Sequence, residues 1–457
     1  MIPVVTPEEM GAVDRAAPEP VEVLIERAGA AVARAAVALM GGTYGRRVVV
    51  IAGKGNNGND GRAAARRLRR RGVRVHVVDP GVRRVDDCDL VIDAAFGTGF
   101  RGEYAWPSLP VGVPVLAVDI PSGVDGTTGA VAGVVPPARR TVTFAALKPG
   151  LLFEPGASLA GEVVVADIGL DVGSARAHVV EEGDVASWLP SRAPTTNKWR
   201  SAVRVVAGSA GMAGAAALVS SGALRAGAGY VRESSPGVPP GRPDPVEAVQ
   251  VPLPAEGWAP AVLADLDRFG SLVVGNGLGT APGTQGQIRE VVTASKVPVV
   301  VDADGLTALA AAPAPLTPMV VLTPHDGEFA RLAGAPPGAD RIASARGLAE
   351  RLGGVVLLKG GPTLVAEPTG EVLVVANGDA RLATAGTGDV LAGMVGALVA
   401  QGLDPFRAAA AAAFLHGEAG ALGWRHGLVA GDLPGLVPEV LERLSRDPTR
   451  RRSRPGG

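Results

Sequence analysis

The sequence is poor in cysteine and in aromatic residues. Its one cysteine, Cys88, has no partner within the chain, so an internal disulfide is excluded. Cys88 is flanked by Asp86, Asp87 and Asp89, and neighbouring negative charges raise the pKa of a thiol. A catalytic thiolate is therefore not expected. Aromatic residues make up only 4% of the chain, so the core must be built from aliphatic side chains.

An excess of charge of either sign is also lacking. The chain has 44 Lys+Arg against 45 Asp+Glu, and a protein with so little net charge has no field that attracts nucleic acid or an anionic membrane. No apolar run is long enough to span a bilayer, and residues 1–7 lack the basic stretch and apolar core of a secretory signal. We expect a cytoplasmic protein that acts on small molecules, without nucleic-acid or membrane partners.

Aliphatic residues are abundant and form short apolar segments, most of which end near Gly, Asp or Pro. In the first half we expect a helix over residues 7–39, with Thr6 near its start. Segments of crossover length separate the strands that follow, which is the βαβ pattern of a parallel, Rossmann-like α/β domain. These strands are expected at residues 48–52, 73–78, 90–93, 115–120, 141–144, 162–168 and 177–181.

The second half repeats this pattern and predicts another α/β domain. At 457 residues the chain is too long for one core, since single cores stop growing near roughly 250–300 residues. The polar, proline-bearing stretch 187–197 marks the expected boundary, so the predicted domains are 1–190 and 191–445, and 446–457 is expected to be a disordered basic tail. Strands of the second domain are expected at 203–207, 272–275, 297–302, 319–322, 355–358 and 372–375.

A glycine turn followed by an acid and an apolar helix lies at residues 383–393. Free backbone N–H groups and the positive end of a helix dipole at 386–388 would face an anion such as phosphate. Asp389 stands where it could take a proton from a hydroxyl group. This segment predicts a phosphate-binding site with a candidate base beside it.

A second glycine-rich segment, 51–61, follows an apolar strand and precedes a helical run rich in arginine. Asn56 and Asn57 add side-chain amides to it, and Asp93 and Asp119 follow two further strands. Amide, carboxylate and hydroxyl oxygens gathered at adjacent strand ends suit a hard cation and a polar substrate. The alternative is that each aspartate only caps its loop.

These loops resemble the NAD(P)H-hydrate epimerase family, in segments 53–61, 93–99, 119–123 and 141–150. The resemblance implies that Asp119 is the acid/base for a ring opening that interconverts the R and S hydrates. One departure is Asn59, where the family has Gly; at positive φ, Asn would be the least costly replacement. By resemblance, K⁺ is held by Asn57, Asp93 and Ser122, and the hydrate contacts Asn56, Asn57, Gly58, Asn59, Asp60, Gly97, Thr98, Gly99, Phe100, Arg101, Gly102, Glu103 and Asp119.

Residues 197–441 resemble the ADP- or ATP-dependent NAD(P)H-hydrate dehydratases, which share the ribokinase-like fold. The matching segments are 206–215, 223–229, 275–279, 301–306, 323–329, 358–363 and 386–389. The resemblance implies ADP as the phosphoryl donor, with ATP as the other candidate, and Mg²⁺ bridging the phosphates. It places Gly279, His325 and Asp389 at the hydrate, and Lys359, Gly360, Gly361, Pro362, Thr363 and Gly388 at the nucleotide.

Two departures from this second family stand out. Residues 197–202 lack the usual glycine-rich pattern, which would alter a loop near the site, and Ala385 replaces a usual Gly beside the anion hole. His416 lies within an alanine-rich helical run and is expected to pack in or near the core.

The leading interpretation is a bifunctional enzyme that epimerises hydrated NADH and NADPH and dehydrates the S form. Its partners are then these hydrates and ADP, and the resemblance implies a homo-oligomer. One alternative is a ribokinase-superfamily kinase fused to a nucleotide-binding module, because the 386–389 turn would serve it equally. Another is that the first half is a binding or scaffold module without catalysis.

Overall fold

The computed structural model describes residues 1–445, so the basic tail expected at 446–457 lies outside the described residues. The chain divides into two compact units, Ile2–His178 and a second unit that begins at Val179. This division precedes the expected boundary, because α5 (Glu182–Trp188) packs against helices of the second unit and shares its core. No helix within 1–445 is long and apolar enough to cross a membrane.

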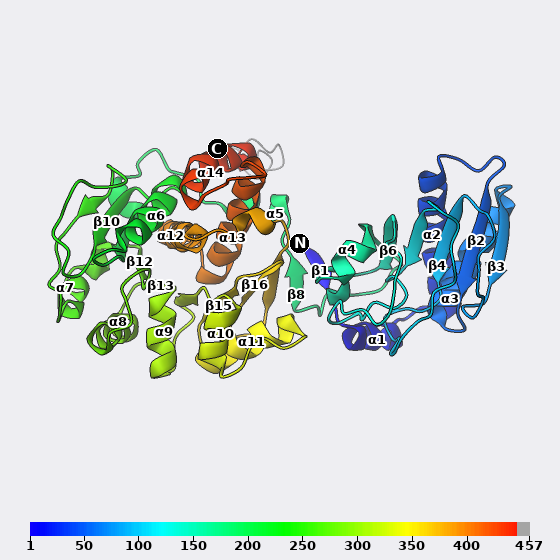
Figure 1. Ribbon diagram of the computed structural model, residues 1–457, viewed down its shortest axis with the longest axis horizontal. Coiled ribbons are helices and arrows are strands. Elements are labelled where there is room, and N and C mark those ends of the chain that lie inside the picture. Colours follow the sequence, from blue (N-terminus) through cyan, green and yellow to red (C-terminus); the bar gives the residue numbers. More distant parts are fainter. Residues whose placement is uncertain (446–457) are drawn as a thin grey trace. The chain divides into compact units, whose positions relative to one another are not determined.

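The first unit is built on a parallel sheet of six strands, which confirms the expected α/β class (Figure 1). Expected strands are recovered with small shifts at their ends, but β8 (Ala177–Val179) is not part of this sheet, contrary to the prediction. The strand order is β3 (Arg74–Val78), β2 (Arg47–Ala52), β4 (Leu90–Ala94), β5 (Val115–Val118), β6 (Arg140–Phe144) and β7 (Glu162–Ala166).

The prediction of a single helix over residues 7–39 is wrong. The structure has α1 (Pro7–Ala16) and α2 (Val21–Met40), separated by a segment that contains Pro18 and Pro20. Proline lacks an N–H group and clashes with a preceding helical turn, which explains the break. Thr6 caps α1 as expected, since its hydroxyl accepts from the N–H of Glu9 at 3.2 Å.

The two faces of this first sheet are covered differently. Helix α2 and helix α3 (Asn56–Arg70) pack on one face, over alternate residues such as Val48, Val50 and Ile92. The other face, which includes Val49 and Ile51, is covered largely by side chains from loops within 85–113. The unit therefore has helices mainly on one side of the sheet. Besides these two helices and α1, the unit contains only the short helix α4 (Gly156–Ala160) and one 3₁₀ turn.

The second unit contains a longer sheet that is parallel at one end and antiparallel at the other. Strands β10, β11 and β16 were not predicted; β10 carries the charged residues Arg232 and Glu233, and β16 follows directly on a Gly-Gly-Pro loop. The parallel strands are β11 (Val249–Gln250), β10 (Tyr230–Ser234), β9 (Ala202–Val206), β12 (Ser271–Val274), β13 (Val299–Val301), β14 (Val320–Leu322) and β15 (Val355–Leu358), followed by the antiparallel β16 (Thr363–Ala366) and β17 (Val372–Val375).

Helices cover both faces of the second sheet (Figure 1). One face is packed by α6 (Ala213–Arg225), α12 (Thr387–Ala400), α13 (Pro405–Leu422) and α14 (Leu433–Ser445). The other carries α8 (Pro282–Ala294), α9 (Asp304–Ala311), α10 (Asp326–Ala333) and α11 (Arg341–Leu352), with the short α7 (Ala259–Leu263) beside α8. This is a three-layer α/β/α arrangement.

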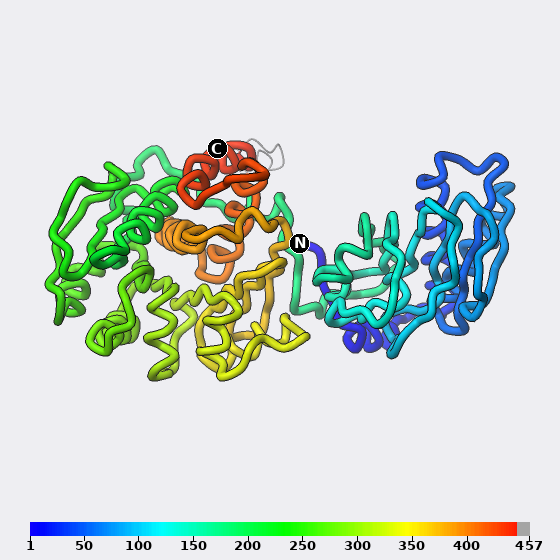
Figure 2. The backbone as a smooth tube through the Cα atoms, viewed as in Figure 1, coloured from blue at the N-terminus to red at the C-terminus, as the bar shows by residue number. Residues whose placement is uncertain are grey.

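Helices α6 and α12 lie in close contact, as the green and orange segments of the chain trace show (Figure 2). Two glycines allow this approach. A Cβ atom on Gly393 would lie 2.0 Å from the carbonyl oxygen of Val219, and one on Gly222 would lie 2.3 Å from that of Val390. The position of α12 therefore depends on the absence of side chains at this contact.

We predict that Gly393→Ala lowers the free energy of unfolding by about 1–3 kcal/mol, because overpacking forces the two helix backbones apart. Gly286→Ala in α8 is the matched control, since a Cβ there meets nothing within 4 Å. It is expected to raise stability by roughly 0.5–1 kcal/mol through helix propensity. Urea denaturation measures both changes, and equal effects for the two variants would contradict this packing.

Candidate active sites

A cavity of about 1010 Å³ lies in the first unit, next to the carboxyl ends of β2, β4 and β5. Open α/β sheets place their ligands at this edge. Among the residues predicted to contact the hydrate, Gly58, Asn59, Gly102 and Glu103 do not line the cavity. Those that do are Asn56, Asn57, Asp60, Gly97, Thr98, Gly99, Phe100, Arg101 and Asp119.

The segment predicted as a glycine-rich loop is partly helical. Helix α3 begins at Asn56, so Asn57 to Asp60 form its first turns and only 53–55 form the loop. Gly58 is required there, because a Cβ atom would lie 1.9 Å from the carbonyl oxygen of Gly53. Asn59 is helical and is not among the residues with positive φ, so its replacement of Gly causes no backbone strain.

Two of the three predicted potassium ligands are hydrogen-bonded to each other. Asp93 is fully buried at the end of β4, and its carboxylate accepts from the hydroxyl of Ser122 at 2.6 Å and from the Ser122 N–H at 2.7 Å. Burial raises the pKa of Asp93 to about 6, although these hydrogen bonds oppose the shift. The third, Asn57, has a buried side-chain amide with no hydrogen-bond partner within 1–445.

Asp119 is held by a buried lysine. The Lys148 ammonium is 1% exposed and donates to the Asp119 carboxylate at 2.6 Å, to the Thr143 hydroxyl at 2.9 Å and to the Phe144 carbonyl at 3.0 Å. The Thr143 hydroxyl also donates to Asp119, at 3.0 Å. Asp119 has a φ of 66°, a strained value for a residue other than glycine. Several contacts thus fix one carboxylate at the cavity wall.

Asp60 has a contrasting environment in the same cavity. Its side chain projects from α3, the residue is 8% exposed, and no hydrogen bond or ion pair of its carboxylate is found within the described chain. Burial, together with the negative charges of Asp119 and Asp14, raises the pKa of Asp60 to about 8.

In the second unit, the turn at 386–389 forms the start of α12, as predicted. Gly386 caps the helix with a φ of 90°, and α12 begins at Thr387. The N–H of Thr387 donates to the carbonyl of Thr384 at 3.3 Å, so fewer free donors remain than the sequence predicts. The N–H groups of Gly388 and Asp389, in the first helical turn, have no partner within an α-helix and remain available to an anion.

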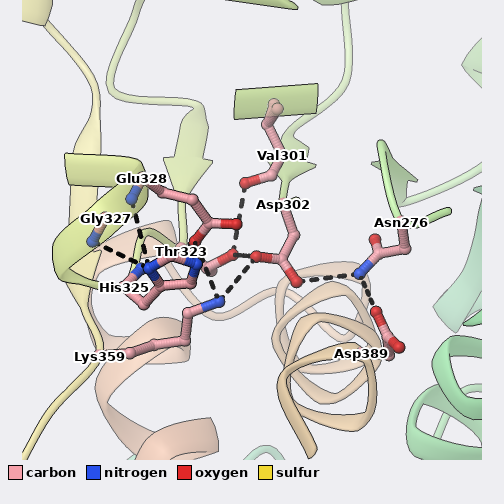
Figure 3. A network of polar contacts seen from close by, with 9 residues as sticks. All are labelled: Asn276, Val301, Asp302, Thr323, His325, Gly327, Glu328, Lys359 and Asp389. Carbon is pink, nitrogen blue, oxygen red and sulfur yellow. Dashed lines mark hydrogen bonds and ion pairs between the residues drawn. The ribbon is translucent and has the colours of Figure 1, made fainter. Parts of the chain in front are cut away.

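Asp389 is joined to a buried polar network at the carboxyl ends of β12, β13 and β14 (Figure 3). The Asn276 amide donates to Asp389 at 2.7 Å and to Asp302 at 2.9 Å. Burial raises the pKa of Asp389 to about 6. The hydrogen bond from Asn276 lowers this pKa, and the negative charge of Asp302 raises it by a smaller amount.

Lys359 completes this network from the end of β15. Its ammonium lies 3.0 Å from Asp302 and 3.6 Å from Glu328, while the Thr323 hydroxyl donates to Asp302 at 2.7 Å. Burial disfavours the ammonium, but the two carboxylates outweigh it and raise the pKa of Lys359. A Cβ atom on Gly388 would lie 3.4 Å from the Lys359 ammonium, so the lysine flanks the start of α12.

The other predicted residues of the second unit lie around this network. His325 is exposed and caps α10, accepting at Nδ1 from the N–H groups of Gly327 at 3.0 Å and Glu328 at 3.3 Å. The Gly279 N–H donates to Asp304 at 2.8 Å. Residues 360–362 form the exposed loop between β15 and β16, with only Pro362 buried, and Thr363 begins β16.

Several expectations about single residues are settled by the structure. Residues 197–202 lead into the amino end of β9, opposite the strand ends that carry Asp302 and Thr323, so they do not form a loop near the site. His416 is buried as expected, and burial lowers its pKa to about 4. Burial is the main cause of the raised pKa of Cys88, more than its neighbouring charges.

Five residues of these two sites were not predicted from the sequence: Lys148, Asn276, Asp302, Thr323 and Glu328. All of them stand in segments that matched the two families, which was the available signal. Their partners are distant in sequence, as Asn276 and Asp389 illustrate, so spacing alone could not reveal the contacts.

Comparison with known proteins agrees with this geometry. A family profile described as NAD(P)H-hydrate dehydratase matches residues 203–441, and one described as the N-terminus of YjeF-related proteins matches 21–84 and 79–150. A protein of Moorella thermoacetica is 36% identical over 97% of this chain and 97% of its own length, and is named bifunctional NAD(P)H-hydrate repair enzyme Nnr. The chain belongs to the family of bifunctional NAD(P)H-hydrate repair enzymes. A family member from Mycobacterium tuberculosis is 40% identical over 83% of this chain and 84% of its own length.

Solved structures agree for the second unit of this repair enzyme. The ADP/ATP-dependent NAD(P)H-hydrate dehydratase of Bacillus subtilis, co-crystallized with ATP/Mg²⁺, is 33% identical with a TM-score of 0.52, covering 58% of this chain and 97% of its own. A ribokinase-like protein of Enterococcus faecalis, 20% identical with a TM-score of 0.53 over 59% of this chain and 97% of its own, shares the fold. The ribokinase-like prediction is confirmed.

We predict that Lys148→Met in this repair enzyme lowers the free energy of unfolding by roughly 3–5 kcal/mol, because it leaves the largely buried Asp119 carboxylate without its cation. Arg140→Met is the matched control, since it breaks an ion pair with Glu162, whose side chain is 62% exposed, and should cost at most about 1 kcal/mol. Calorimetric unfolding of both variants measures the difference. Similar losses in the free energy of unfolding would show that the buried Asp119–Lys148 pair stabilises the fold no more than the exposed pair does.

Proposed function

We propose that the first unit of this chain is an NAD(P)H-hydrate epimerase and that the second is an ADP-dependent (S)-NAD(P)H-hydrate dehydratase. The observation that carries the proposal is that each unit places a carboxylate, held by neighbouring side chains, at the carboxyl edge of its sheet. These carboxylates are Asp119 and Asp389. By the family resemblance, each of them is expected to contact the reacting hydroxyl.

In the epimerase, the reacting carbon of the hydrated nicotinamide ring carries both a hydroxyl group and the ring nitrogen. Asp119 takes the hydroxyl proton, a carbonyl forms, and the bond between carbon and ring nitrogen breaks. Rotation and reclosure then present the other face of the carbonyl. Lys148 holds the Asp119 carboxylate in place for this step through its hydrogen bond of 2.6 Å.

Potassium is the proposed cation of the epimerase half. Two observations on the described residues support a cation at this position. The buried side-chain oxygen of Asn57 has no hydrogen-bond partner, and the buried Asp93 has no cationic side chain within hydrogen-bond distance. An oxygen-only donor set of Asn57, Asp93 and Ser122 fits a hard monovalent ion. Such an ion supplies positive charge that orients the polar end of the substrate.

In the dehydratase, Asp389 takes the proton of the hydrate hydroxyl as the oxygen attacks the terminal phosphate of ADP. The start of α12 and Lys359 stabilise the transferred charge. The phosphate then leaves with the former hydroxyl oxygen, a ring proton is lost, and NAD(P)H, AMP and phosphate result. Within 1–445 no group of three or more His, Cys, Asp or Glu could hold a metal, so a magnesium ion held mainly by the nucleotide phosphates fits best.

The kinase alternative is not favoured, because the family members share both halves of this chain rather than the turn at 386–389 alone. The scaffold alternative is disfavoured by the Asp119–Lys148 pair and the cavity beside it. We further propose that the enzyme is cytoplasmic and homo-oligomeric, as the sequence analysis expected.

The test is the recovery of reduced-nicotinamide absorbance from mixed R and S NADPH hydrates with Mg²⁺ and excess ADP. We predict full recovery for the unaltered enzyme. Asp119→Asn should stop at the S fraction, because only the dehydratase still works, whereas Asp389→Asn should abolish recovery. The absence of recovery with either ADP or ATP, or a stably phosphorylated product, would contradict the proposal.

The raised pKa of Asp389 predicts the pH dependence of the dehydratase. A general base works only when ionised, so its rate should fall as the pH drops through about 6. Asn276→Ala removes a hydrogen bond that lowers this pKa, so the fall should begin at higher pH, with a loss in kcat of roughly tenfold. Asn197→Ala, at the opposite edge of the sheet, is the control. Identical profiles for the two variants would refute the role of Asn276.

A further inference from the structure

The cavity of the first unit contains two buried or partly buried carboxylates whose surroundings differ in charge. Asp119 lies 2.6 Å from the Lys148 ammonium and also accepts from the Thr143 hydroxyl. Asp60 comes from a separate element, α3, and faces the same cavity with no cation or hydrogen-bond donor in reach within the described residues.

The charged groups around Asp60 do not neutralise it. Burial is the largest cause of the raised pKa of Asp60. The negative charges of Asp119 and Asp14 come next, and both disfavour the ionised form of Asp60. Lys148 is already committed to Asp119. The remaining charged side chains that line the cavity are Glu19, Lys54, Asp79 and Arg101, of which Arg101 lies 4.0 Å from Asp125.

Opening the hydrated ring moves two protons at different atoms. The hydroxyl loses one as the carbonyl forms, and the ring nitrogen gains one as it receives the electrons of the broken bond. A single carboxylate at one position serves only one of these atoms at a time. A base and an acid in different protonation states serve both, which is the arrangement that acid–base enzymes use when two carboxylates differ in environment.

We propose that Asp60 is a second catalytic residue of the epimerase, which donates a proton to the ring nitrogen while Asp119 accepts one from the hydroxyl. Reclosure returns both protons, so atoms, electrons and charges balance over the cycle with no further reactant. This inference rests on the proposed epimerase function. The burial and the neighbouring negative charges of Asp60 explain why it holds a proton at neutral pH, since its pKa is raised to about 8.

The experiment measures interconversion of purified R and S NADPH hydrates across pH, with Asp60→Asn compared with the unaltered enzyme. We expect kcat to fall by about 100-fold or more, the usual contribution of a general acid, with KM changed less than threefold. The unaltered enzyme should lose activity as the pH rises through about 8, and Asp60→Asn should lack this alkaline limb. Asp86→Asn, an exposed acid-to-amide change in the same unit, should behave like the unaltered enzyme.

Each outcome decides the matter. An unaltered enzyme that interconverts the hydrates but shows no alkaline loss overturns the inference without any variant, and so does Asp60→Asn activity within threefold of normal. An increase in KM alone would assign Asp60 to binding only. Failure of the unaltered enzyme to interconvert the hydrates would instead overturn the proposed epimerase function. Dehydratase activity on S hydrate and calorimetric unfolding of Asp60→Asn identify a variant that has failed to fold, in which case the pH profile of the unaltered enzyme decides.

Discussion

In each unit of this chain, a lysine at the carboxyl edge of the sheet pairs with one or two carboxylates, and a further carboxylate in the same site has no cation in contact. In the first unit Lys148 pairs with Asp119 at 2.6 Å, and Asp60 is left with a pKa raised to about 8. In the second, Lys359 pairs with Asp302 at 3.0 Å, and Asp389 is left with a pKa raised to about 6. Burying a charge is costly unless it is paired, so burial raises the pKa of the unpaired carboxylate in each site.

The fold supplies this arrangement because parallel strands end at one edge of a sheet. In the first unit β4 ends near Asp93, β5 is followed by Asp119, and α3 starts beside them at Asn56. In the second, strands β12, β13 and β14 bring Asn276, Asp302 and Thr323 together, and the close contact of α6 with α12 sets the position of Asp389. Glycines at Gly58 and Gly393 allow the backbones to approach where a side chain would collide. These glycines therefore allow the helix packing that sets the positions of the site residues.

Much of this fold could be predicted from the sequence, because buried parallel strands such as β2 and β12 are continuous apolar runs with polar or glycine-rich ends. The helix expected over 7–39 was wrong because apolar spacing continued across Pro18 and Pro20, and the charges of Arg232 and Glu233 concealed β10. The positions of Asp119 and Asp389 at the carboxyl edges of their sheets could be predicted from motifs. The bridging role of Asn276 and the hold of Lys148 on Asp119 could not, because they arise from contacts between residues far apart in sequence. The raised pKa of Asp60 depends on burial by the tertiary structure, which no local sequence pattern encodes.

The most direct test of this account is the protonation state of the two unpaired carboxylates in the resting enzyme, measured by infrared difference spectroscopy at pH 7. Asp60→Asn and Asp389→Asn are each compared with the unaltered protein. We predict that Asp60→Asn removes a protonated carboxyl band, because the pKa of Asp60 is raised to about 8. Asp389→Asn should instead remove an ionised carboxylate band, because the pKa of Asp389 is raised only to about 6. Loss of an ionised band in both variants would show that Asp60 is charged at rest and would contradict the unequal pairing on which the account depends.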